Sequence, residues 1–79
     1  MDEKRKRIKS RWRTWRRAQM LSQTRAAQLG GVSRSTAQRW EYPESSQLPD
    51  VAQLVTICEG LHIKPDRALL FLIGGGANG

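Results

Sequence analysis

Large apolar side chains in the first twenty residues are spaced three or four positions apart. Ile8, Trp12 and Trp15 follow this spacing and therefore share one face of a helix, while lysines and arginines occupy most of the other positions. The pattern predicts an amphipathic first helix that turns both tryptophans toward a hydrophobic core. Residues 1–6 are predicted to be either a flexible basic arm or the start of this helix.

Two short helical patterns separated by glycines follow between positions 21 and 41. Ser22 is a suitable N-cap for the first of them, which carries Ala26, Ala27 and Leu29 at helical spacing. The glycine pair 30–31 is predicted to end this helix, because glycine adopts the left-handed conformation that closes a helix at little steric cost.

The next helix is predicted to run from Arg34 to about Glu41, with Ser33 as its N-cap. Its inward side chains are Val32, Ala37 and Trp40. Thr36 points toward the flank of the helix. The four polar side chains that point outward are Arg34, Ser35, Gln38 and Arg39. Arginine and glutamine can bond base edges, and serine and threonine can contact bases or phosphates. The pattern indicates a helix-turn-helix that enters a DNA groove, and an ordinary solvated helix surface is the alternative.

Two further helices are predicted in the last third of the chain. One begins near Pro49 and Asp50, ends at Gly60, and turns four side chains inward: Val51, Leu54, Val55 and Cys58. The other begins at Pro65, which suits the first helical position, and continues to Ile73. The glycine-rich residues 74–79 are predicted to be a flexible tail. The sequence thus predicts a compact all-α, five-helix domain over residues 7–73.

The run from Ala68 to Ile73 is too apolar for one helix face to bury. An exposed apolar patch suggests a partner, and a homodimer interface is predicted at the end of this helix. Its residues would be Leu70, Phe71, Leu72 and Ile73. The alternative is that Leu69, Leu70 and Ile73 close the core over the two tryptophans.

Positive charge is concentrated at one end of the chain. The 79 residues carry a net charge of +7, with 14 basic and 7 acidic side chains. Residues 1–17 hold nine of the basic and two of the acidic side chains, which gives the whole +7, and the remainder is neutral. A polyanion is the natural partner, because each phosphate that is neutralised releases counterions. The alternative is a solvated segment that confers solubility.

Several other classes of protein find no support in the sequence. Cys58 and His62 are the single cysteine and the single histidine, so neither a disulfide nor a metal site is predicted, and no catalytic set or phosphate loop is present. No enzyme activity, cofactor or small-molecule ligand is expected. No segment approaches the ~20 apolar residues that span a bilayer. A cytoplasmic single-domain protein without room for an effector domain is therefore expected.

The joint spacing of several short motifs resembles the Cro and phage-repressor helix-turn-helix family, also called the xenobiotic-response-element family. The resemblance covers about residues 8–71. Its markers are Ser22-Gln23, Ala27, Gly31-Val32-Ser33, Trp40-Glu41, Leu54, Cys58, Leu61, Ile63 and Pro65-Asp66. It implies a lambda-repressor-like five-helix fold that binds a double-stranded DNA operator.

The resemblance also implies roles for individual residues. Base contacts would come from Arg34, Ser35 and Arg39, with Gln38 beside them, and an ion pair of structural importance would join Arg16 to Glu41. Gln23 would contact a phosphate at the start of its helix. Independently of the resemblance, Ser33 and Thr36 are predicted as further phosphate contacts, because their hydroxyls can bond phosphates. Relatives often contact phosphates from the loop after the Trp-Glu pair, but residues 42–49 contain Pro43 and Glu44 and no basic side chain. We expect the amino-terminal arginines to replace those contacts: Arg5, Arg7 and Arg11.

The sequence therefore predicts a small transcriptional regulator of Cro type that occupies an operator and excludes polymerase or a competing regulator. One alternative is an antitoxin that regulates its own gene and binds a protein partner through its apolar last helix. Another is a basic amphipathic helix that binds RNA or an anionic membrane, with Trp12 and Trp15 as stacking or interfacial residues.

Overall fold

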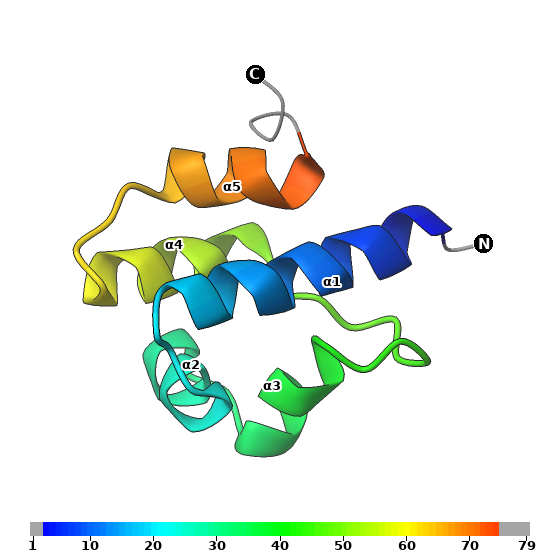
Figure 1. Cartoon of the computed structure of the whole chain (residues 1–79). Helices are drawn as coiled ribbons and strands as arrows, with labels where there is room; N and C mark the ends of the chain where they lie inside the picture. The colour runs from blue at the N-terminus through cyan, green and yellow to red at the C-terminus, as the bar shows by residue number, and fades with distance from the viewer. Residues whose placement is uncertain (1–2, 75–79) are drawn as a thin grey trace.

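The computed structural model describes residues 3–74, and within them the chain forms five α-helices (Figure 1). These are α1 (Glu3–Ala18), α2 (Gln23–Gly30), α3 (Arg34–Arg39), α4 (Val51–Gly60) and α5 (Pro65–Ile73). The predicted all-α fold is confirmed. In Figure 1, α5 and α3 lie on opposite sides of α1 and α4. Residues 3–6 belong to α1, whereas positions 1–2 of the predicted arm and 75–79 of the predicted tail lie outside the described residues.

Local side-chain and backbone chemistry determines where α2 and α3 begin and end. The Ser22 Oγ accepts the backbone N–H of Arg25 at 3.0 Å, and the Ser33 Oγ accepts that of Thr36 at 3.1 Å. Gly31 has a φ of 71°, and its N–H donates to carbonyls in the last turn of α2. The two helices therefore meet at a sharp, capped turn, as the sequence pattern predicts.

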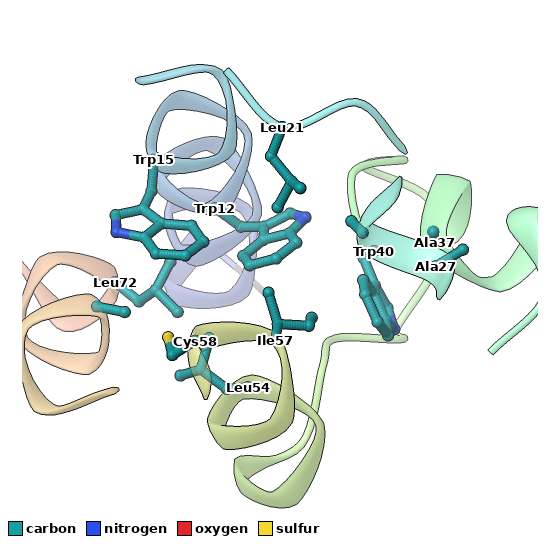
Figure 2. Packing of buried hydrophobic residues seen from close by; sticks show 12 residues of the cluster. Trp12, Trp15, Leu21, Ala27, Ala37, Trp40, Leu54, Ile57, Cys58 and Leu72 are labelled. Atoms are coloured by element: carbon teal, nitrogen blue, oxygen red, sulfur yellow. The ribbon is translucent and has the colours of Figure 1, made fainter. Parts of the chain in front are cut away.

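Three tryptophans form the centre of the core (Figure 2). Trp12 stacks on Trp15 with ring centroids 5.5 Å apart, and it meets Trp40 in a T-shaped pair at 5.7 Å. Ile57 and Cys58 pack beneath them, and burial raises the pKa of the Cys58 thiol. Because Trp12 and Trp15 are buried, the alternative in which they stack on bases or enter a membrane is wrong.

The inward face of α4 differs from the predicted one. Ile57 is fully buried, while Val51 is 69% exposed at the rim of a groove shared with α5. α4 ends at Gly60, as predicted, but Gly60 itself does not adopt the left-handed conformation, which falls at His62 with a φ of 59°. Gly60 instead makes room for Leu29, because a Cβ at Gly60 would lie 2.5 Å from the Leu29 Cδ2.

The buried face of α5 also differs from the predicted one. Leu72 is buried, with 5% of its surface exposed, so it contributes to the core and not to an exposed interface. Leu69, Leu70 and Ile73 remain exposed, so the alternative in which they close the core is wrong as well. Gly74, placed in the tail by the prediction, caps α5 with a φ of 82°. No helix within residues 3–74 combines the length and the apolar character needed to cross a bilayer.

Candidate nucleic-acid interface

The four predicted base-reading side chains are all exposed on α3. Arg34, Ser35, Gln38 and Arg39 point away from the core, while Ala37 and Trp40 are buried in it. Their spacing of three and four residues places them as neighbours on one helix face. Thr36 lies at the flank of this face and is half-buried. All four exposed side chains of the face are polar. It therefore presents two guanidinium groups, an amide and a hydroxyl to solvent.

A polar groove of about 870 Å³ adjoins this face and separates it from α1 and the start of α2. The described residues that line it come from α1, from the first turn of α2, from α3 and from the chain after α3: Arg13, Arg16, Arg17, Ser22, Gln23, Thr24, Arg34, Ser35, Gln38, Arg39, Glu41, Tyr42 and Pro43. Five of these side chains are arginines and one is a carboxylate, so the lining carries a net charge of +4. A cleft with this charge concentrates anions at its mouth.

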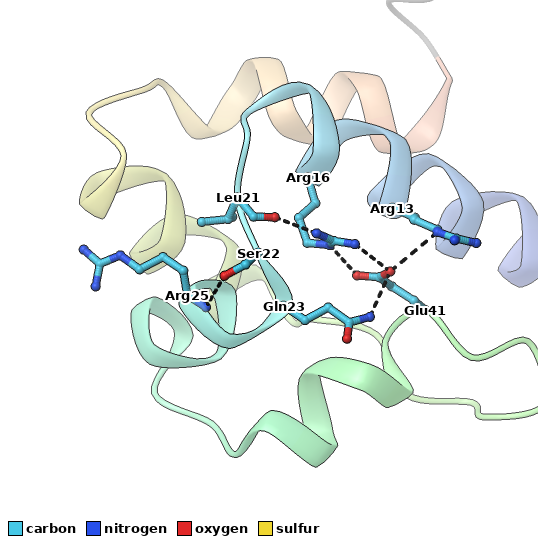
Figure 3. Close-up of polar contacts among 7 residues, drawn as sticks. All are labelled: Arg13, Arg16, Leu21, Ser22, Gln23, Arg25 and Glu41. Atoms are coloured by element: carbon cyan, nitrogen blue, oxygen red, sulfur yellow. Dashed lines mark hydrogen bonds and ion pairs between the residues drawn. The ribbon is translucent and has the colours of Figure 1, made fainter.

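Glu41, which follows α3, connects it to α1 and to the start of α2 at the base of this groove (Figure 3). Its carboxylate accepts the Arg16 Nε at 2.6 Å and the Arg16 Nη2 at 3.2 Å, a bidentate pair. The Gln23 Nε2 donates to the same carboxylate at 3.2 Å, and the Arg16 Nη1 donates to the Leu21 carbonyl at 2.6 Å. The side chains of Arg16 and Glu41 are 10% and 7% exposed, so the pair holds the elements together and is not itself open to DNA.

The predicted phosphate-contacting residues differ in how much hydrogen-bonding capacity is left to them. Gln23 gives one amide hydrogen to Glu41 and keeps a second. The Ser33 hydroxyl caps α3 and also donates to the Thr36 Oγ1 at 3.1 Å, so both of its functions are taken inside the protein. Thr36 accepts that bond and keeps its own hydrogen for an external acceptor. The geometry therefore favours Gln23 and Thr36 over Ser33 for contact with phosphate.

Arg11 lies on the side of α1 that faces the end of α5 and not the groove. Its guanidinium covers Gly74 and donates from Nη1 to the Leu72 carbonyl at 3.5 Å, next to the end of α5. Arg7 precedes Arg11 by four residues and so shares that flank of the helix. The structure therefore does not bring Arg7 and Arg11 to the groove. The reason is that α5, and not α3, packs along their side of α1.

Arg13 and Arg17, which the sequence did not single out for phosphate contact, are the exposed arginines that α1 brings to the groove. Both are exposed and line the groove, and Arg13 Nε lies 4.0 Å from the Glu41 carboxylate. Arg13 comes three residues before Arg16, and Arg17 comes directly after it, so the predicted Arg16–Glu41 pair already indicated which side of the helix faces α3. Within residues 3–74, Arg17 has no ion-pair partner.

Lys9 is a second departure from the predicted basic surface, because it is 2% exposed. Its Nζ donates to two backbone carbonyls, those of Arg39 and Gln47, each at 2.6 Å. Burial lowers the pKa of Lys9, the charge of Arg5 lowers it further, and Glu41 partly opposes both. Arg5 is exposed and precedes Lys9 by four residues, so the two share one flank of α1.

A sharp turn between α2 and α3, an outward polar face on α3 and an adjoining cationic groove define a helix-turn-helix DNA-binding domain. A family model described as helix-turn-helix matches residues 13–67. The chain belongs to this family, the Cro and C1 type of helix-turn-helix proteins, as its sequence motifs indicate. The family consists of regulators that bind double-stranded DNA and not of enzymes. Comparisons with curated proteins and with solved structures found no match.

Proposed function

We propose that this protein is a sequence-specific repressor of Cro type, which inserts α3 into the major groove of an operator and thereby excludes polymerase or a competing regulator. The observation that carries the proposal is the joint position of the exposed polar face of α3 and the groove of charge +4 beside it. Such a pair of surfaces suits base edges and the flanking phosphates of one duplex. The protein would act in the cytoplasm of a bacterial cell or a phage-infected host.

Base recognition would come from the four outward side chains of α3. Arg34 and Arg39 are suited to bidentate contact with guanine, and Gln38 to bidentate contact with adenine. Ser35 lies on the same exposed face and can bond either bases or phosphates. Each bidentate contact is worth roughly 1 to 3 kcal/mol of discrimination against the wrong base.

Phosphate contacts would come from residues that border the groove. Arg13 and Arg17 project from α1, and the free amide hydrogen of Gln23 lies at the start of α2, where the helix dipole also favours an anion. Thr36 and Arg5 are further candidates beside α3 and along α1. These contacts would give affinity for any duplex, and α3 would give the preference among sequences.

Selection from random duplex DNA, followed by titration of variants, tests the proposal. Arg39→Ala is expected to weaken binding to the selected sequence by about tenfold to a hundredfold, the equivalent of one bidentate contact, and binding to random duplexes by much less. Arg25→Ala is the matched control, since this exposed arginine lies on α2 outside the groove and bonds Gln28. An equal loss on selected and random DNA for Arg39→Ala would contradict the proposal.

We also infer a homodimer that binds two half-sites about one helical turn apart. Leu70 and Ile73 remain 48% and 58% exposed on α5, together with Leu69, and Phe71 is half-buried. Leu72, which the sequence analysis included in this interface, is excluded by its burial. Ile73→Ser is expected to weaken self-association in sedimentation experiments while leaving the circular dichroism spectrum unchanged. A monomer at all concentrations, free and on operator DNA, would refute the dimer.

An antitoxin-type regulator is the second candidate function. A groove of about 570 Å³ between α1 and α5 is lined by Trp15, Ile63, Leu70 and Phe71, and Lys64 and Arg67 border it. This mixture of apolar and basic groups suits a protein partner, and the groove lies away from α3. Co-purification of one defined second polypeptide, abolished by Leu70→Ser, would favour this candidate over a free-standing repressor.

A further inference from the structure

Lys9 differs from the other lysines of α1 in its surroundings. Lys4 and Lys6 are exposed, whereas Lys9 lies beneath the end of α3, with its ammonium group between the carbonyls of Arg39 and Gln47. The residues it joins are 30 and 38 positions away in the chain. A single side chain thus connects α1 to the last residue of α3 and to the linker that follows.

The end of α3 needs such a connection because the helix is short. Six residues are far too few for a helix to be stable by itself, and the last carbonyls of any helix have no partner within it. Ser33 caps the start of α3 and Trp40 fixes its end from the core side. The Arg39 carbonyl accepts the Tyr42 N–H at 3.3 Å, and the Lys9 ammonium gives it a second, shorter hydrogen bond and a positive charge at the negative end of the helix dipole.

The second hydrogen bond extends this connection to the linker. The chain between α3 and α4 contains no helix within residues 42–50, and the Gln47 carbonyl is its attachment to Lys9. A bond at 2.6 Å between an ammonium and a carbonyl is short and charge-assisted. Because Lys9 is buried, its ammonium cannot reach the phosphates of DNA, and its charge acts inside the protein.

We propose that Lys9 is a positioning residue for DNA recognition, which holds the main chain of Arg39 at a fixed depth so that the Arg39 guanidinium meets its base pair in register. The inference rests on the proposed function of α3. Specificity would then depend on a cation that never contacts DNA. Exposed cations of the same helix would contribute affinity without specificity.

Lys9→Met tests this role, and Lys4→Met is the matched control, because it removes the same charge from an exposed site on the same helix. Binding is measured by fluorescence anisotropy on the selected operator, on operators changed at one base pair at a time, and on random duplex DNA. Lys9→Met is expected to lower discrimination at the base pair read by Arg39 by about tenfold, while random-duplex affinity changes less than about twofold. Lys4→Met is expected to leave every discrimination ratio unchanged.

A readout that a general loss of stability would not produce comes from the double variant. In Lys9→Met/Arg39→Ala, discrimination at that base pair should equal the value for Arg39→Ala alone, since Lys9 acts through Arg39. Additive losses, or an equal loss of discrimination at every base pair of the operator, would overturn the proposal. If Lys9→Met does not fold, Lys9→Arg replaces it. The guanidinium keeps the positive charge but is larger and planar, so it is expected to displace the Arg39 carbonyl. Wild-type discrimination in Lys9→Arg would overturn the proposal.

Hydrogen exchange on the free protein separates this inference from the proposed function. The Trp40 and Glu41 amides donate to the Thr36 and Gln38 carbonyls at the end of α3, and they should exchange about tenfold faster in the Lys9 variant while α4 amides do not change. Unchanged exchange would overturn the inference whatever the DNA result. Wild-type protein without preference among duplexes would overturn the proposed function, whereas wild-type preference retained in the Lys9 variant would overturn the inference alone.

Discussion

The buried ion pair between Arg16 and Glu41 makes Glu41→Gln the most informative test of what holds the recognition helix in place. The substitution keeps the shape of the side chain and removes its charge. It leaves the Arg16 guanidinium without a counter-charge in a site that is only 10% exposed, with the Leu21 carbonyl and a single amide oxygen as its acceptors. It also weakens the acceptor of the Gln23 amide.

The expected loss is large relative to the stability of so small a domain. Removing one partner of a buried pair costs about 3 to 5 kcal/mol, because the other charge stays desolvated. A chain of this length has a free energy of unfolding of about 4 to 12 kcal/mol. A loss of about 3 kcal/mol corresponds to a fall in Tm of about 12 to 24 °C. Glu41→Gln is therefore expected to leave the protein close to the limit of folding at physiological temperature.

Urea unfolding followed by tryptophan fluorescence measures this effect, since all three tryptophans lie in the core. Glu44→Gln is the control, because Glu44 is exposed and has no ion-pair partner within residues 3–74, and its effect should stay within about 0.5 kcal/mol. A double-mutant cycle with Arg16→Met separates the pair from the Leu21 bond. A loss below about 1 kcal/mol for Glu41→Gln would refute the reasoning, because it is the value of a solvent-exposed pair.

Three further outcomes follow from the same structure. Combining Arg13→Gln with Arg17→Gln is expected to reduce the slope of log affinity against log salt concentration by about 0.9 for each phosphate that is no longer neutralised, as measured by anisotropy at several salt concentrations. Arg7→Gln is the control and should not change this slope. An equal effect of Arg7→Gln would place the phosphates on the α5 side of α1. Gly31→Ala is expected to lower the free energy of unfolding by about 1 to 2 kcal/mol in urea titrations, since the position has a φ of 71° but open space around its Cβ, and an unchanged midpoint would exclude strain there. The free energy of unfolding of the wild type, relative to that of Lys9→Met, should rise between neutral pH and the ordinary lysine pKa of 10.5. The reason is that the lowered pKa of folded Lys9 makes the folded protein release its proton at a lower pH than the unfolded chain does. A difference that stays constant with pH would show that the pKa of Lys9 is the same in both states.

Features set by neighbouring residues were predictable from the sequence. The caps at Ser22 and Ser33 and the left-handed Gly31 depend on short-range chemistry, so the boundaries of the helix-turn-helix follow directly from the residue types. The outward face of α3 followed from the two apolar positions Ala37 and Trp40. The inward face of α1 was equally clear, because Ile8, Trp12 and Trp15 are large apolar side chains at helical spacing among many basic residues.

Features set by packing between distant elements were not predictable. The run 68–73 is apolar at every position, so it contains no phase that could select Leu72 over Leu70 as the buried residue. Residues 51–58 likewise offer apolar side chains on more than one face, and the contacts of α4 with its neighbours select Ile57 over Val51. Lysine is ordinarily a surface residue, and the two carbonyls that bury Lys9 come from residues far along the chain.

The basic residues of α1 show most clearly why charge counting alone cannot assign function. Every position outside the apolar stripe is a candidate for phosphate contact in the sequence, but α5 lies along one flank of the helix and α3 along the other. Burial then divides the cations that face α3 into two groups. Lys9 and Arg16 are desolvated and fix the end of the recognition helix and the carboxylate after it, whereas Arg13 and Arg17 stay in solvent beside the groove. Salt screens the exposed group far more than the buried one, so raising the salt concentration should weaken affinity for all duplexes while the preference among sequences persists.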